Sequence, residues 1–238
     1  MPVTIYYIIL LHDIMKGKKT KTYTKKNDLT KKVKKVVDRQ IAKITELKFF
    51  DTKMSSSRVQ RGNNPQAVKC LTLVAQGLLD ENRVGDKLTL TSLNMRITVQ
   101  LSNQTTAIAL YSVHRIIILQ YHPQYDCSVA IPLTYFMFPS DTGQEYTRGQ
   151  FTIDRKKDFS IIYDKTFSYY DSNAGGSMAN KFHGYNISLK KAQKDVQYDA
   201  ASATTMRNSL WCYVLGPDDN AVTNPNAFGT WRIRFRDA

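Results

Sequence analysis

The sequence contains little cysteine and no cysteine pair at metal-binding spacing. Its three cysteines, Cys70, Cys127 and Cys212, are odd in number and form no C-x-x-C motif. A disulfide framework or a zinc site of that kind is therefore not expected. We predict three buried free thiols, which suits a reducing compartment such as the cytosol or the nucleus.

The N-terminal apolar run is too short to cross a membrane. Residues 2–11 (PVTIYYIILL) are apolar, whereas a membrane-spanning helix needs about 20 such residues. The positive charge begins at Lys16, after this run, and a signal peptide would carry it in front. We therefore expect no membrane insertion. An additional strand, a tail, or a true translation start at Met15 are interpretations that the residues leave open.

The motifs of several enzyme classes are also missing. The chain has no G-x-S-x-G elbow, no P-loop and no H-E-x-x-H. None of the four histidines lies in a metal-binding pattern such as H-x-H followed by Glu, and we interpret His114 as a strand residue and His122 as a loop residue. We predict that the protein is not an enzyme and that it has no catalytic residue, metal ligand or cofactor.

Positive charge is abundant and is concentrated near the N-terminus. Residues 1–48 hold 13 Lys or Arg against 4 Asp or Glu, a net charge of +9, whereas the remaining 190 residues hold 21 against 16, a net charge of +5. A basic segment on a nearly balanced body is typical of proteins that bind a polyanion. We favour nucleic acid over an acidic membrane surface or a lysine face that serves only solubility.

Residues 16–35 (KGKKTKTYTKKNDLTKKVKK) carry most of this charge and too few apolar side chains to order themselves. Lysine contacts phosphate as a point charge without reading bases, and Tyr23 alone offers little base stacking. The tract could also act as a nuclear localisation signal for an import receptor. The predicted nucleic-acid-binding residues are Lys16, Lys18, Lys19, Lys21, Lys25, Lys26, Lys31, Lys32, Lys34, Lys35 and Arg39.

Residues 29–44 show a helical spacing of apolar residues, and Asp28 or Thr30 could cap the start of a helix. We expect a short amphipathic helix whose solvent-exposed face is basic. Two interpretations stay open: the helix packs against the rest of the protein, or it faces bound DNA. The apolar positions are Val33, Val36, Val37, Ile41 and Ile44.

After residue 45 the chain shows strand signals and no sustained helix. Apolar residues recur mostly every second position in residues 88–99, which predicts a strand with one buried face. The run at residues 113–119 (VHRIIIL) predicts a central strand that is buried on both faces or lies in a tight interface. Residues 151–154 and 159–170 are expected to pair around a charged tip, RKKD. We predict an all-β protein of about eight to ten strands in two packed sheets; spacing alone does not separate a jelly roll from an immunoglobulin-like sandwich.

Several segments of the chain are informative through their order and spacing and not individually. They are ELKFFDT, VAQG, RVGDKLTLTSLNMR, FTIDRKKDFSIIYDK, SLWCYVLGP and the final TWRIRFRDA, and they follow a lysine-rich arm. Together they resemble the capsid proteins of small circular single-stranded DNA viruses, the group that includes circoviruses and geminiviruses. The resemblance covers about residues 42–238. The chain departs from it in a lysine-based rather than arginine-rich arm, and in the apolar segment before that arm.

The resemblance implies a single jelly-roll shell domain of about eight strands over residues 45–238, behind a basic arm with a short helix over residues 1–44. It also implies self-assembly into an icosahedral shell, of about 60 copies if the shell is the smallest closed type. Circular single-stranded DNA would lie inside, against the lysine arm. The protein would then occur in the virion and, during assembly, in the host nucleus, and residues 169–173 (YYDSN) could contact a cell-surface receptor.

Two other functions stay open. One is a monomeric nucleic-acid-binding β-domain of the movement or silencing type, which would remain at the 27.2 kDa of a single chain. The other is a carbohydrate-binding jelly roll, for which residues 169–173 offer a weak site of aromatic, acidic and amide side chains.

Overall fold

The computed structural model of the chain describes residues 30–34, 36–37, 47–59, 67–79, 81–100, 110–140, 146–171, 180–200, 202–216 and 225–237. The chain divides into two units, Met1–Thr45 and Glu46–Ala238, and each is described by itself. In the first unit, residues 30–34 and 36–37 are helical. The remainder of the predicted helix at residues 29–44 lies outside the described residues.

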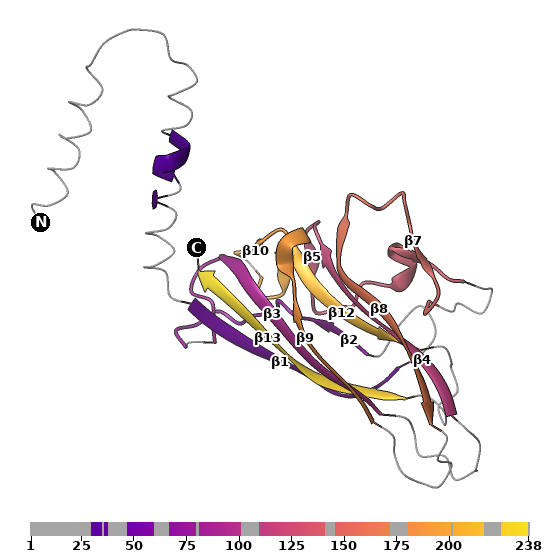
Figure 1. Ribbon diagram of the computed structural model, residues 1–238. Helices are drawn as coiled ribbons and strands as arrows, with labels where there is room; N and C mark the ends of the chain where they lie inside the picture. The colour runs from indigo at the N-terminus through magenta and orange to yellow at the C-terminus, as the bar shows by residue number, and fades with distance from the viewer. Residues whose placement is uncertain are drawn as a thin grey trace, which may run out of the picture. The chain divides into compact units, whose positions relative to one another are not determined.

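The larger antiparallel sheet brings together the two ends of the second unit. β1 (Leu47–Arg58), β13 (Asn226–Asp237) and β3 (Lys87–Gln100) lie side by side (Figure 1). The far edge of β3 pairs with β9 (Asn180–Ile187) and, near its start, with β10 (Asp195–Tyr198). The sheet continues from β10 through β11 (Thr205–Arg207) to β5 (Tyr125–Asp126).

The alternation that predicted β3 is confirmed. Its even-spaced apolar side chains are buried, and the one break in the alternation, between Leu90 and Leu93, has a structural cause. The pairing of β3 with β13 shifts register there, so that Thr91 is an extra residue between the partners of Arg234 and Phe235. Such a β-bulge lets both leucines face the core although three positions separate them.

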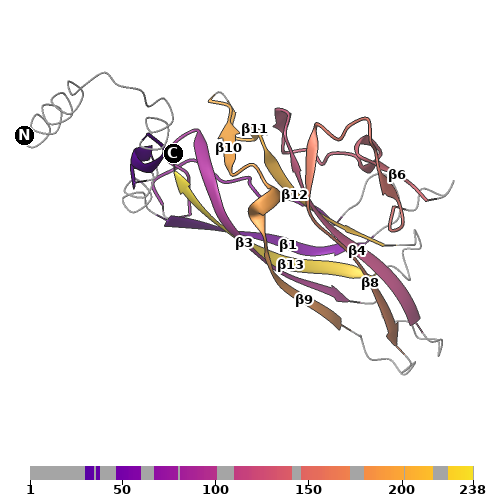
Figure 2. The ribbon, with the colours of Figure 1, turned by 45° about the horizontal axis from the view of Figure 1, so that its top comes forward.

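The smaller sheet has the order β2 (Val68–Cys70), β12 (Ser209–Leu215), β4 (Leu110–Tyr121) and β8 (Phe159–Asp171). Figure 2 shows β4 and β8 running side by side, away from the layer formed by β1, β13 and β3. Every residue of β12 is buried, as is each residue from Val113 to Tyr121 in β4. The prediction of a central strand buried on both faces is therefore confirmed within one subunit.

Two different partners cover the two faces of this smaller sheet. The even-numbered residues of β4 and β12 face the larger sheet: His114, for example, contacts His183 of β9. The odd-numbered residues face the covering segment, which we define as residues 127–140 and 146–152. Tyr213 donates a hydrogen bond from its hydroxyl to the carbonyl of Ile131, over 2.9 Å, and its ring lies 5.3 Å from that of Phe136.

The covering segment contains little regular structure and is held by side chains. It includes a 3-10 turn, η1 (Leu133–Tyr135), and the short pair β6 (Met137–Phe138) and β7 (Gln150–Phe151). Arg115 of β4 donates to the carbonyl of Gly149 over 2.7 Å and forms a two-pronged ion pair with Asp164 of β8. Arg115 is 8% exposed, so its satisfied donors hold this loop against the sheet.

The predicted pairing of residues 151–154 with residues 159–170 is wrong. Phe151 ends β7, whose partner is β6, and β8 pairs with β4 along its whole length. Residues 153–158 form turns, with hydrogen bonds from the amide of Lys156 to the carbonyl of Ile153 and from Asp158 to Arg155. The charged RKKD segment thus connects two layers rather than two neighbouring strands, because β4 offers β8 a longer apolar partner.

The prediction of an all-β fold is confirmed: the described residues form antiparallel sheets, with helical structure at residues 30–34 and 36–37 and in two 3-10 turns. Among them, no helix has the length and apolar character required to cross a membrane. The core between the two sheets contains Trp231, Ile233 and Phe235 from β13, packed with side chains from β3, β4 and β12. Burying this apolar surface is the main stabilising contribution to the fold.

Candidate nucleic-acid interface

The structure describes three of the predicted nucleic-acid-binding residues. Lys31, Lys32 and Lys34 lie in the helical residues 30–34 and are exposed. Their apolar neighbours Val33 and Val36 are exposed as well. Binding by the arm remains a prediction. The other predicted binding residues lie outside the described residues: Lys16, Lys18, Lys19, Lys21, Lys25, Lys26, Lys35 and Arg39.

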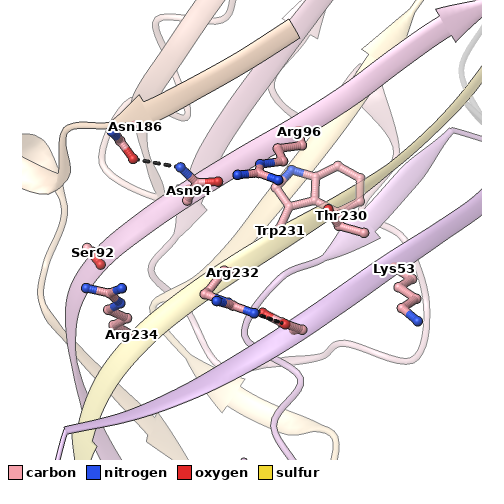
Figure 3. Close-up of a pocket in the computed structure, with 10 residues that line it drawn as sticks. Lys53, Ser92, Asn94, Arg96, Asn186, Thr230, Trp231, Arg232 and Arg234 are labelled. Carbon is pink, nitrogen blue, oxygen red and sulfur yellow. Dashed lines mark hydrogen bonds and ion pairs between the residues drawn. The ribbon is translucent and has the colours of Figure 1, made fainter. Parts of the chain in front are cut away.

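A second concentration of positive charge lies on the outward face of the larger sheet. Figure 3 shows Arg96 of β3 and Arg232 and Arg234 of β13 on this face, with Lys53 of β1 beyond them. They line a hollow with a volume of about 460 Å³. We call this hollow the arginine groove, and we define it by Lys53, Asn94, Arg96, Asn186, Arg232 and Arg234, together with Asp51.

Strand pairing explains why these residues meet. Arg232 lies opposite Asp51 of β1 on one side and opposite Asn94 of β3 on the other. Asn94 in turn lies opposite Asn186 of β9, and its side-chain amide donates to the Asn186 oxygen over 2.7 Å. One row of side chains therefore crosses four strands, with neighbouring strands about 4.8 Å apart. Lys53 and Arg96 flank Thr230 in the next row.

Positive charge dominates the groove. Among the described residues that line it, Asp51 is the one acidic side chain. Its two carboxylate oxygens accept hydrogen bonds from Nε and Nη2 of Arg232 over 2.7 and 2.6 Å. The hydrogen bond from Arg232 holds the pKa of Asp51 below its usual value, and Asp51 in turn raises the pKa of Arg232. Four cations face one anion, so the groove has a net positive charge, which attracts anionic groups.

The described residues show no arrangement typical of a metal site. They contain no group of three or more His, Cys, Asp or Glu side chains that could hold a metal ion. His114 and His183 are buried with their Nε2 atoms 2.8 Å apart, so one ring donates to the other and links β4 to β9. His122, after β4, bonds to Asn208 and to Ser160.

The prediction of buried free thiols is confirmed. Cys70, Cys127 and Cys212 are all free and buried. Burial raises the pKa of the Cys212 thiol, and the hydrogen bond that Cys127 donates to Cys70, together with burial, raises the pKa of Cys127. Burial also raises the pKa of Cys70, but the hydrogen bonds that its sulfur accepts from Cys127 and Thr72 outweigh burial and lower that pKa. Protonated buried thiols are poor nucleophiles and poor metal ligands, so we assign Cys127 and Cys212 to packing.

Reasoning from the sequence missed the arginine groove, although one signal for it was present. In the final segment TWRIRFRDA, arginines alternate with Trp231, Ile233 and Phe235. Period-two alternation predicts a strand with apolar side chains on one face and a row of arginines on the other. Arg96 and Asn186 carry no such signal, because only strand register brings them beside Arg232.

The sequence matches no protein-family model, and no curated protein matches it either.

Proposed function

We propose that this protein is a viral capsid subunit that forms a closed icosahedral shell and binds single-stranded DNA. The observation that carries this proposal is the strand order of the two sheets. The DNA and the shell are expectations from the resemblance to capsid proteins, and the charged surfaces of the chain support them.

The strand order supports a jelly roll rather than an immunoglobulin-like sandwich. One sheet contains β1, β13, β3 and β9, and the other contains β2, β12, β4 and β8. Going along the chain, these eight strands mostly alternate between the sheets, and the first pairs with the last. In an immunoglobulin-like sandwich, by contrast, the first two strands are neighbours in one sheet. Eight strands in two sheets with long connections are typical of a jelly roll.

The charge distribution supports a polyanion inside such a shell. The lysine arm carries a high positive charge without base-reading side chains. The arginine groove adds a second cationic surface on the folded unit. Both would neutralise phosphate, and binding should weaken as salt concentration rises. On this proposal the protein resides in the virion and, during assembly, in the host nucleus.

A monomeric nucleic-acid-binding β-domain is the second candidate, because the arginine groove lies within one chain and requires no second copy. Size-exclusion chromatography with light scattering separates the two candidates. A shell of about 60 copies of this 27.2 kDa chain would have a mass of roughly 1.6 MDa. Closed particles in electron micrographs support the capsid proposal, whereas a monomer at every concentration and salt tested contradicts it.

The role of the arm is tested by changing its charge in the full-length chain. Replacing the arm lysines by glutamine should abolish DNA packaging and leave the sandwich folded, because the described core of the sandwich is built from residues between Met54 and Phe235. Replacing the same lysines by arginine is the matched control and should preserve packaging, since charge and not lysine itself is required. DNA-filled particles from the glutamine variant, or from a chain without residues 16–35, would refute the role of the arm.

A further inference from the structure

An exposed aromatic ring lies beside the arginine groove. Phe182 of β9 is 63% exposed although it belongs to a strand of the larger sheet. It lines a second hollow, of about 280 Å³, together with Arg96, Asn94 and Asn186, which also line the arginine groove. The two hollows therefore lie next to each other on this face, with three residues that line both of them.

The absence of a side chain at Gly184 leaves room on the sheet for the Phe182 ring. Gly184 lies opposite Arg96 in the pairing of β3 with β9. A Cβ atom at Gly184 would lie 2.9 Å from Cε1 of Phe182, which is closer than van der Waals contact permits. The ring thus lies over the space that a side chain would fill. The ring lines the same hollow as Arg96, and much of its surface is open to solvent.

A second aromatic side chain borders the groove on the opposite side. Phe49 of β1 is 45% exposed, and the guanidinium carbon of Arg232 lies 5.0 Å from the centre of its ring. Cations therefore occupy the middle of this face, and an aromatic ring lies at each margin. Proteins that bind single-stranded nucleic acid use this combination, because cations contact the backbone while bases stack on exposed rings.

We propose that the arginine groove and Phe182 together bind a short segment of single-stranded nucleic acid. Arg96, Arg232 and Arg234 would contact successive phosphates, and a base would stack on Phe182. The inference rests on the proposed function for the class of ligand, and it adds a site on the folded unit that acts independently of the lysine arm.

The aromatic ring favours nucleic acid over other polyanions. A sulfated polysaccharide or an anionic lipid surface would meet the same arginines but has no planar base for Phe182. Asn94 and Asn186 provide amide groups between the cations and the ring, and such groups can donate to phosphate or sugar oxygens. The site uses the phosphate and base that DNA and RNA share, so oligo-dT and oligo-U are both suitable probes.

Binding of a fluorescent 15-nucleotide oligo-dT to the full-length protein, measured by anisotropy over a range of salt, tests the site. R96Q/R232Q/R234Q should lower the slope of log affinity against log salt by about 2, since each lost phosphate contact on a single strand contributes about 0.7. Phe182→Ala should weaken binding about fivefold or more at constant salt slope. The control K156Q/K157Q/K190Q removes the same charge from exposed positions outside the groove and should leave binding near that of the wild type.

Three comparisons decide the result. An oligomer of abasic sites, or heparin, has no base to stack and should bind the wild type and Phe182→Ala with equal affinity. If the two proteins also bind oligo-dT with equal affinity, base stacking on Phe182 is refuted. If the groove variant binds like wild type while the arm glutamine variant does not bind, the groove proposal fails and the proposed function stands. If the wild type binds no oligonucleotide, both fail.

Crosslinking keeps the proposal testable without any substitution. An oligonucleotide that carries 5-iodo-deoxyuridine, irradiated on the wild-type protein and digested, should yield a crosslinked peptide that contains Phe182. Crosslinks found only in residues 16–39 would overturn the proposal. The urea midpoint of Phe182→Ala should match that of the wild type, and that of the three-arginine variant should fall only slightly, because the altered side chains are exposed and only the Asp51–Arg232 pair is lost.

Discussion

The outward faces of the two sheets differ in what covers them. On the smaller sheet, the covering segment buries Tyr213 and Arg115, and every residue of β12 is inaccessible. On the larger sheet, Arg96, Arg232 and Arg234 are exposed, and they line a hollow on that face. The protein closes one face with its own chain and leaves the other open.

This difference indicates where stability and binding are located. Buried aromatic rings and a satisfied buried arginine stabilise the closed face, where any loss leaves a cavity or an unpaired group. The open face is polar and charged, so its side chains contribute little to stability and can change partners. We therefore expect substitutions on the closed face to change the free energy of unfolding, and those on the open face to change binding.

Removing a ring of the covering segment should have the largest effect. Phe136 is 1% exposed and packs against Tyr213, Phe151 and Phe159. Phe136→Ala should lower the free energy of unfolding by about 3–5 kcal/mol, because it loses buried area and leaves a cavity. Urea denaturation followed by tryptophan fluorescence measures the loss. A change below about 1 kcal/mol would show that the segment does not seal the sheet.

The same substitution at two arginines sharpens the comparison. Arg115→Gln on the closed face removes the partner of Asp164 and the donor to the Gly149 carbonyl. It should cost about 2–3 kcal/mol. Arg234→Gln on the open face is the matched control and should change stability by less than about 0.5 kcal/mol. Equal losses in urea denaturation would remove the distinction between the two faces.

The smallest effect concerns the pH dependence of the Asp51–Arg232 pair. The hydrogen bond from Arg232 lowers the pKa of Asp51 in the folded state, so the pair stabilises the fold above the carboxyl pKa of the unfolded chain. That contribution is lost as the pH falls through the lower, folded-state pKa. Asp51→Asn should therefore have a slightly lower urea midpoint than wild type at pH 6, and the two midpoints should converge as the pH falls through the folded-state pKa of Asp51.

The same substitution acts on binding with the opposite sign. At pH 7, Asp51→Asn removes the acidic side chain of the groove and frees the Arg232 guanidinium for phosphate. Oligo-dT should bind this variant more tightly than it binds the wild type. This gain in affinity should be smaller than the loss of affinity in R96Q/R232Q/R234Q. Weaker binding would mean that Asp51 orients Arg232 for the ligand instead of competing with it.

Local patterns predicted several strands well. Alternation predicted β3, and the apolar run at residues 113–119 predicted a strand buried on both faces. The pairing at residues 151–170 was wrong, because a charged turn between two apolar segments looks the same whether the segments pair or enter different layers. The sequence carried a signal for only one part of the arginine groove, the arginines that alternate with apolar residues in β13.

The sequence by itself determined the all-β class and the buried positions of β3 and β4, because the pattern of apolar residues along a strand is a local property of the chain. It also determined the uneven distribution of charge between the arm and the remaining chain. Only the tertiary structure decided that Arg96, Arg232 and Phe182 share one surface. They come from β3, β13 and β9, and the register between distant strands depends on how the whole core packs.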